Sequence, residues 1–529
     1  MWKSLLDGNF DKFKLGIAGG ADIYSTNRDL SSTLHYAARG PNIETVKFLT
    51  KDKMISTGLI NIHGQTALHV AANSGRNITV KFLVAEMGNS INEVDDSGRT
   101  PLHLASQNGH KKTVAALLSL GAKITTNDDS GYFPLHSATL NNYLDVVKYL
   151  LEKGASVDEK SFFGSQTPLH MSVSVGNMET IKYLLLSGAD GMSPLYEAVQ
   201  NNHEEVVKIL MEKGAFINNG DLMHNNTPFH IAVLNGNAFI IRLLLQHNAN
   251  INARGKEDLT PLLFAANKGH AEIVDLLLQN GALADSRDVL GSTVLHHAAD
   301  WGHSSVVENL IRRGIDLHTL NINKYTALHM AAQEGHRQVV DILLAAGANV
   351  HSVNEEGFTP LHLSAGNGHE AISEALIKKG SNVNSKNSTN NITPLHEAAA
   401  KKCNEKIIQL LLKHGADVNE KGEFGSTALH IASFAGNSSV VEALLKGNAD
   451  VDAKNNEEDT ALLLAISGNH KNTVEILLKY GADINHVDYE GFSILYSAIR
   501  NNNKDMLDIL IAKGADFNVG EGQLLLTTI

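Results

Sequence analysis

The sequence predicts an all-α repeat solenoid in which short helix-turn-helix units stack one on the next. Two observations predict it. The tetrapeptide Thr-Pro-Leu-His, or a close variant, returns almost always after 33 or 34 residues, and glycines recur where each pair of helices should end. A period near 33 indicates one supersecondary unit repeated many times. A unit this short cannot bury its apolar surface alone, so its stability must come from stacking on its neighbours.

The last position of the recurring tetrapeptide is usually histidine, and in four units tyrosine or leucine replaces it. The histidines are His35, His69, His103, His136, His170, His230, His296, His329, His362, His396 and His430. The replacements are Tyr196, Leu263, Leu463 and Tyr496.

One repeat shows why each element should form. Thr359 can accept hydrogen bonds from the first free amides of a helix, and Pro360 suits the first helical position. An apolar helix follows and should end near residues 366–368. A second helix is predicted over residues 369–379, with a broad apolar surface that two neighbours can cover. The polar stretch after Gly380 should form an extended turn or hairpin.

Two stretches of the sequence show a resemblance to a known family. Gly98 to His110 (GRTPLHLASQNGH) and Thr326 to Ala348 (TALHMAAQEGHRQVVDILLAAGA) resemble the ankyrin repeat nearly throughout. The resemblance extends over essentially the whole chain. It implies helix-turn-helix units joined by β-hairpin fingers, in a curved superhelical stack with a concave face. It also implies that the repeated histidine is structural, with its imidazole hydrogen-bonded to the cap and the neighbouring turn.

The register of the repeats predicts the organisation of the chain. Residues 1–30 should form a degenerate N-terminal capping repeat, followed by fifteen units. The interval between His170 and Tyr196 is only 26 residues, because the finger at residues 188–193 is shortened. This shortening is either a harmless loop deletion or a kink that separates repeats 31–190 from repeats 191–529. The apolar residues 522–529 suggest that the last repeat is degenerate or truncated, as in a fragment of a longer protein.

The composition limits the classes of partner. The 529 residues carry a formal charge of −13, and an acidic chain repels phosphate backbones, so we expect no nucleic acid partner. Cys403 is the only cysteine, which favours a reducing compartment. The apolar runs are too short to cross a bilayer, and the first residues lack an apolar stretch suited to secretion. We expect a cytoplasmic protein, with membrane association only through a partner or a fused domain.

The sequence motifs do not indicate a catalytic or metal-binding site. The repeated histidines would lie roughly 10 Å apart in packed helices, too far to share an ion whose bonds to nitrogen are about 2 Å. His296 and His297 form one local doublet, which we interpret as structural. No zinc, phosphate-binding or nucleophile motif appears. We therefore expect no enzyme activity, no metal, no cofactor and no small-molecule substrate.

The family resemblance also indicates where partner proteins would bind. Ankyrin contacts usually come from finger tips and from the two residues before the glycine that ends the first helix. This rule selects Asp300 and Trp301, and Gln333 and Glu334 in the next unit. Trp301 should point into the concave groove as an anchor, or else pack half-buried on its neighbours. Aromatic residues add to the predicted surface, although some should pack finger against finger: Phe162, Phe163, Tyr325, Phe358, Phe424 and Tyr489 on fingers, and Phe434 on a first helix.

The sequence thus predicts a non-catalytic scaffold or adaptor that binds partner proteins along the concave face and finger tips. An alternative is the ankyrin array of a latrotoxin-like toxin or secreted effector that acts on proteins or membranes of a target cell. An adaptor that recruits a ubiquitin ligase would need an additional recruitment box, and neither end of the sequence shows one.

Overall fold

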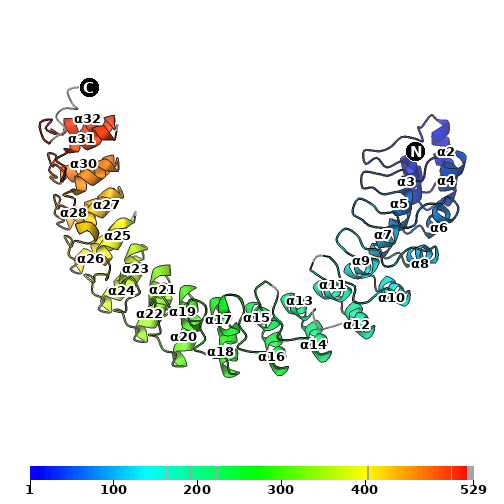
Figure 1. The fold of residues 1–529 in the computed structure, drawn as a ribbon, viewed down its shortest axis with the longest axis horizontal. Coiled ribbons are helices and arrows are strands. Elements are labelled where there is room, and N and C mark those ends of the chain that lie inside the picture. Colours follow the sequence, from blue (N-terminus) through cyan, green and yellow to red (C-terminus); the bar gives the residue numbers. More distant parts are fainter. Residues whose placement is uncertain (163, 190–193, 222, 402–403, 502, 521–529) are drawn as a thin grey trace. The chain divides into compact units, whose positions relative to one another are not determined.

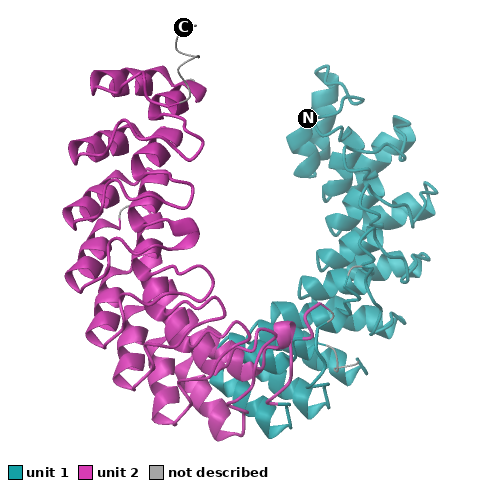
Figure 2. Cartoon of the chain, turned by 60° about the vertical axis from the view of Figure 1, so that its left-hand side comes forward, with its two compact units in different colours: residues 1–221, 226–250 teal, residues 222–225, 251–529 magenta. Residues whose placement is uncertain are grey.

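The computed structural model describes residues 1–162, 164–189, 194–221, 223–401, 404–501 and 503–520. They divide into two compact units (Figure 2). Unit 1 comprises residues 1–221 and 226–250, and unit 2 comprises residues 222–225 and 251–529.

Unit 1 consists of short helices in consecutive pairs, and a π-helix, η1, continues α4. The elements are α1 (Trp2–Leu6), α2 (Phe10–Ala18), α3 (Thr33–Arg39), α4 (Ile43–Lys47), η1 (Phe48–Asp52), α5 (Ala67–Asn73), α6 (Asn77–Ala85), α7 (Pro101–Gln107), α8 (Lys111–Ser119), α9 (Pro134–Leu140), α10 (Leu144–Glu152), α11 (Pro168–Val175), α12 (Met178–Leu186), α13 (Leu195–Gln200), α14 (Glu204–Glu212), α15 (Pro228–Leu234) and α16 (Ala238–Gln246).

Unit 2 repeats the pattern and has two 3₁₀ turns, η2 and η3, in its fingers. The elements are η2 (Lys256–Asp258), α17 (Pro261–Asn267), α18 (Ala271–Gln279), α19 (Val294–Asp300), α20 (Ser304–Arg312), α21 (Ala327–Glu334), α22 (Arg337–Ala345), α23 (Pro360–Gly366), α24 (Glu370–Lys378), α25 (Pro394–Ala400), α26 (Glu405–Lys413), η3 (Glu423–Gly425), α27 (Ala428–Phe434), α28 (Ser438–Lys446), α29 (Ala461–Ser467), α30 (Lys471–Lys479), α31 (Ile494–Arg500) and α32 (Lys504–Ala512).

Each unit has two layers of helices, which confirms the predicted all-α repeat solenoid. The first helix of each pair packs on the first helix of the next, as α19 does on α21 and α21 on α23. The second helices form a parallel row, as α20, α22 and α24 do (Figure 1). The core lies between the two layers of helices and between successive helix pairs, because each repeat buries its apolar residues against the repeats that it contacts.

The repeat at residues 359–391 shows how the predicted local signals act. Thr359 is extended and precedes α23, and Pro360 occupies the first helical position. Helix α24 is one residue shorter at each end than predicted. Its buried side chains include Ile372 and Leu376, which form the apolar surface that the sequence indicated.

The fingers are turns that contain few β-contacts, whereas the family resemblance implied β-hairpins. Within the described residues three isolated β-bridges occur, at Thr26–Ser32, Lys454–Thr460 and Val487–Ser493. In many fingers a side chain binds the amides of the turn: Asn455 Oδ1 accepts hydrogen bonds of 2.9 Å from the amides of Glu457 and Asp459. Backbone hydrogen bonds join successive finger tips, as between the Ile322 amide and the Leu290 carbonyl (3.0 Å).

In the units that have it, the repeated histidine links its repeat to the finger of the next, as His362 does, which confirms the structural role that the family resemblance implied. In the unit at His362, Nδ1 accepts from the Thr359 amide at 3.1 Å and from its hydroxyl at 2.8 Å. Nε2 therefore carries the proton and donates it to the Ile392 carbonyl of the following unit at 3.1 Å. His362 is completely buried, and this burial lowers the pKa of its imidazole to about 4.

A second histidine row, which the sequence reasoning missed, lies at the turn between the two helices. His336 Nε2 donates to the Asp300 carbonyl of the preceding unit at 2.8 Å, and His369 does the same to Gln333 at 2.9 Å. The imidazole of His336 packs against Gly302. A Cβ added at Gly302 would lie 2.5 Å from His336 Nδ1, so glycine is required here by close approach as well as by its φ of +73°.

Asp190–Ser193, in the shortened finger at residues 188–193, lie outside the described residues. The kink at residues 188–193 therefore stays a prediction. Helices α11 and α13, on either side of this finger, pack together within unit 1. The division between the two compact units falls later, near residue 250. Residues 522–529, expected to belong to a truncated repeat, also lie outside the described residues.

The histidine link predicts a defined acid sensitivity. Between pH 6.5 and 4 the unfolded chain binds a proton at His362 before the folded chain does, so stability should rise with pH across this window. At pH 5 this difference in proton binding lowers the free energy of unfolding by about 2 kcal/mol relative to pH 7.5. Thermal unfolding at pH 7.5 and 5 should show a smaller acid-induced loss for His362→Leu than for the unchanged chain.

The same position predicts the cost of breaking the link at neutral pH. His362→Ala should destabilise by about 1–3 kcal/mol, because the Thr359 amide and the Ile392 carbonyl lose buried partners. His362→Leu should cost less, since Leu263 and Leu463 occupy this slot in other units. Urea unfolding at pH 7.5 measures both variants, and equal stability of the alanine variant and the unchanged chain would contradict the assigned link.

A matched pair of glycines predicts the cost of the second histidine contact. Gly347 has a φ of +92° with no atom within 4 Å of an added Cβ, so Gly347→Ala should cost only about 1–2 kcal/mol of backbone strain. Gly302→Ala should cost about 1–3 kcal/mol more, because its Cβ displaces His336. Equal losses in thermal unfolding would show that the His336 contact contributes nothing.

Candidate partner-binding surface

Trp301 directly follows helix α19 and is 57% exposed to solvent. Its backbone is fixed on both sides, because the Asp300 carbonyl accepts from His336 and Gly302 supplies the left-handed turn. The Asp300 side chain is half-buried, and burial together with nearby Glu334 raises the pKa of its carboxyl. Trp301 is thus an exposed ring on a rigid turn beside two acidic residues.

Gln333 and Glu334 end helix α21, the first helix of the next unit. The Gln333 amide donates to Glu334 Oε1 at 3.0 Å, and the Gln333 carbonyl accepts from His369. Their backbone is therefore anchored in the same way as that of Asp300. Asp300 and Trp301 in one repeat, and Gln333 and Glu334 in the next, thus occupy equivalent places at the ends of successive first helices in unit 2.

Phe424 and Phe434, predicted separately, line one hollow of about 250 Å³ in unit 2. Phe424 lies in the finger turn η3 and is 70% exposed, and Phe434 is the last residue of α27 and is 65% exposed. Ile431 on α27 and Leu464 on α29 complete the apolar lining. We call this site the Phe424–Phe434 hollow. It extends across two successive repeats.

Two of the predicted finger aromatics pack on their own repeat. Tyr325 and Phe358 are half-buried, with ring centroids 5.6 and 5.4 Å from the imidazoles of His329 and His362. Their carbonyls accept the histidine bond from the preceding unit. They therefore contribute to the stack and present only part of each ring to a partner.

The remaining predicted aromatics are exposed where the structure describes them. Phe162 lies on a finger of unit 1 and Tyr489 on a finger of unit 2, where its hydroxyl donates to Glu490 Oε1 at 3.2 Å. Phe163 lies outside the described residues, as does Cys403.

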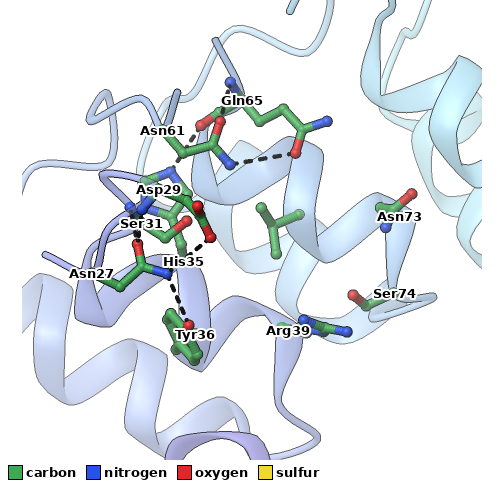
Figure 3. A pocket seen from close by; sticks show the side chains of 11 residues that line it. Asn27, Asp29, Ser31, His35, Tyr36, Arg39, Asn61, Gln65, Asn73 and Ser74 are labelled. Atoms are coloured by element: carbon green, nitrogen blue, oxygen red, sulfur yellow. Dashed lines mark hydrogen bonds between the residues drawn. The ribbon is translucent and has the colours of Figure 1, made fainter. Parts of the chain in front are cut away.

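A polar hollow of about 230 Å³ near the start of unit 1 escaped the sequence reasoning (Figure 3). Asn27 connects two other residues of the lining: its side-chain amide donates to the Tyr36 hydroxyl at 3.1 Å and to Asp29 Oδ2 at 3.3 Å. Arg39 lies on its wall, directly before Gly40. The rule that selected Trp301 therefore also selects Arg39, a signal present in the sequence.

The histidine doublet has separate partners. His296 donates to the Tyr325 carbonyl as part of the repeated link. His297 Nε2 lies 3.1 Å from Asp288 Oδ2, and burial lowers the pKa of His297 despite this carboxylate. Among the described residues no group of three or more His, Cys, Asp or Glu side chains could hold a metal ion. None of the helices in this described part has the length and apolar character needed to cross a membrane.

A comparison with protein families decides the identity of the repeats. The family model for ankyrin repeats (three copies) matches overlapping stretches from residue 1 to residue 521: 1–95, 77–161, 159–221, 187–255, 229–321, 295–387, 374–455 and 429–521. The chain belongs to the ankyrin-repeat family. Ankyrin repeats are generally protein–protein interaction modules.

Relatives match this chain over short stretches. An ankyrin repeat protein of Fowlpox virus is 33% identical over 94 residues, 16% of this chain and 28% of that protein. Rabankyrin-5 of Mus musculus is 34% identical over 116 residues, 18% of this chain and 10% of that protein. Alpha-latrocrustotoxin-Lt1a of Latrodectus tredecimguttatus is 30% identical over 102 residues, 18% of this chain and 7% of that protein. The matched stretches thus cover between 7% and 28% of these relatives.

Proposed function

We propose that this chain is a non-catalytic cytoplasmic scaffold or adaptor that binds partner proteins through the ends of its first helices and its finger tips. The observation that carries the proposal is the exposure of large aromatic rings at these positions of unit 2. Trp301, Phe424, Phe434 and Tyr489 each expose more than half of their surface. Aromatic residues on rigid supports are typical anchors of protein interfaces.

The arrangement of the stack supports this function. The apolar faces of the helices are buried between neighbouring repeats, so the exposed rings add little to the core. Their supports are rigid because the histidine bonds fix the turns on which they lie, as His336 does at Asp300. A surface fixed in this way loses little conformational freedom when a partner binds.

The effector alternative has one observation in its favour, the similarity to a latrocrustotoxin. Rabankyrin-5 is also similar to this chain, and the chain consists of ankyrin repeats. The similarity to the latrocrustotoxin therefore does not favour a toxin over an adaptor, and the scaffold remains the function we propose.

Alanine substitution at both Trp301 and Phe424 tests the proposal. Both rings are exposed, so the double variant should keep its helical circular dichroism while its capture of partner proteins from a cell extract falls about tenfold or more, as expected for lost anchor residues. Quantitative mass spectrometry of the captured proteins compares the variant with the unchanged chain. Identical captured sets from both proteins would refute the assigned surface.

A further inference from the structure

The Phe424–Phe434 hollow combines an apolar floor with an acidic rim. Phe424, Phe434, Ile431 and Leu464 supply apolar surface, and Glu457 and Asp459 also line the hollow. The two carboxylates are carried by one rigid turn, since Asn455 binds both of their amides. Ile431 and Phe434 lie on α27, whereas Leu464 lies on α29 directly after the finger that carries the rim. The bond from His430 to the Asp459 carbonyl (3.0 Å) holds the two repeats together.

The acidic rim is not neutralised by the chain. Within the described residues no ion pair joins Glu457 or Asp459 to a lysine, arginine or histidine, whereas neighbouring Glu458 pairs with Lys454 at 2.9 Å. Burial raises the pKa of Asp459, and Glu457 and Asp488 raise it further. A cation placed at this rim would therefore relieve repulsion between like charges.

The turn η3 fixes the backbone of Phe424 in an uncommon conformation. Its φ is +52°, a left-handed conformation that bulky side chains rarely adopt. Glycine or asparagine would avoid this strain. Glu257 has a φ of +56° in the equivalent turn η2, so this conformation belongs to the turn, which here carries an exposed aromatic ring beside the hollow.

The size of the hollow points to a side chain as the occupant. Its volume of about 250 Å³ lies below the roughly 300–1,000 Å³ typical of sites for cofactors and other small ligands. One large apolar side chain would cover the floor, and a basic residue one or two positions away in an extended segment, which advances about 3.3 Å per residue, would reach the rim.

We propose that the Phe424–Phe434 hollow binds a peptide segment of a partner protein in which a large apolar residue is followed or preceded closely by lysine or arginine. The apolar side chain packs between Phe424 and Phe434, and the basic side chain pairs with Glu457 and Asp459. The same cation can lie against the exposed aromatic faces, which attract positive charge. This inference rests on the proposed protein-binding function and specifies its partner chemistry.

Selection from a library of random 12-residue peptides displayed on phage, with the full chain immobilised, tests the inference. The enriched peptides should share an apolar residue next to one or two basic residues. Fluorescence anisotropy with the most enriched peptide should then show binding about tenfold weaker for Phe434→Ser. A Glu457→Gln, Asp459→Asn double variant should weaken binding several-fold and reduce its salt dependence.

Leu186→Ser is the matched control, because Leu186 is an exposed apolar residue at the end of α12 in unit 1. This variant should bind the peptide unchanged, and circular dichroism should confirm that all variants are folded. Enriched peptides without a basic residue, or binding insensitive to Phe434→Ser, would overturn the inference and leave the proposed function standing. Failure to enrich any peptide would also overturn the inference, while the capture experiment judges the proposed function separately.

Discussion

The hydrogen bond from the repeated histidine to the next repeat is the constraint on which the rest of the structure depends. In each such unit one imidazole closes the cap of its own first helix and donates to the finger of the following unit, as His329 does to the Phe358 carbonyl at 3.1 Å. Local helix formation and stacking are thereby coupled through a single buried side chain. Since each unit contacts only its neighbours, this coupling sets how cooperatively the array behaves.

The binding surface follows from the same constraint. Residues that face a neighbouring repeat are buried by packing, while side chains at the ends of several first helices and on several finger tips are exposed. Trp301 directly follows a first helix, Phe434 ends one, and Phe424 occupies a finger turn. Function on this scaffold therefore depends on which side chains occupy those positions, and the acidic residues beside them determine the charge of the partner they suit.

Much of the fold could be predicted from the sequence because its signals are local and repeated. The cap at Thr359 and the proline after it fixed the start of α23 to the residue, and the histidine slot was correctly interpreted as structural. The fingers were predicted less well, since the resemblance implied β-hairpins and the described fingers contain isolated β-bridges, as at Lys454–Thr460.

The site could be predicted only in part, because exposure depends on contacts between repeats. Tyr325 and Phe358 carry the same signal as Phe424, yet they pack on the histidines of their own units. Phe424 and Phe434 were selected independently, and only the three-dimensional structure shows that they share a hollow with Glu457 and Asp459. Arg39 was overlooked although it precedes a glycine in the way that Trp301 does.

Hydrogen–deuterium exchange on the full chain carrying His329→Leu tests the central claim most directly. His329 is completely buried and bridges two units, the one that contains α21 and α22 and the one whose finger leads into α23. Faster exchange confined to these two units and their immediate neighbours is the result expected of a nearest-neighbour stack. Unchanged exchange there, or a uniform increase across the whole of unit 2, would contradict the assignment of the histidine as the link between adjacent repeats.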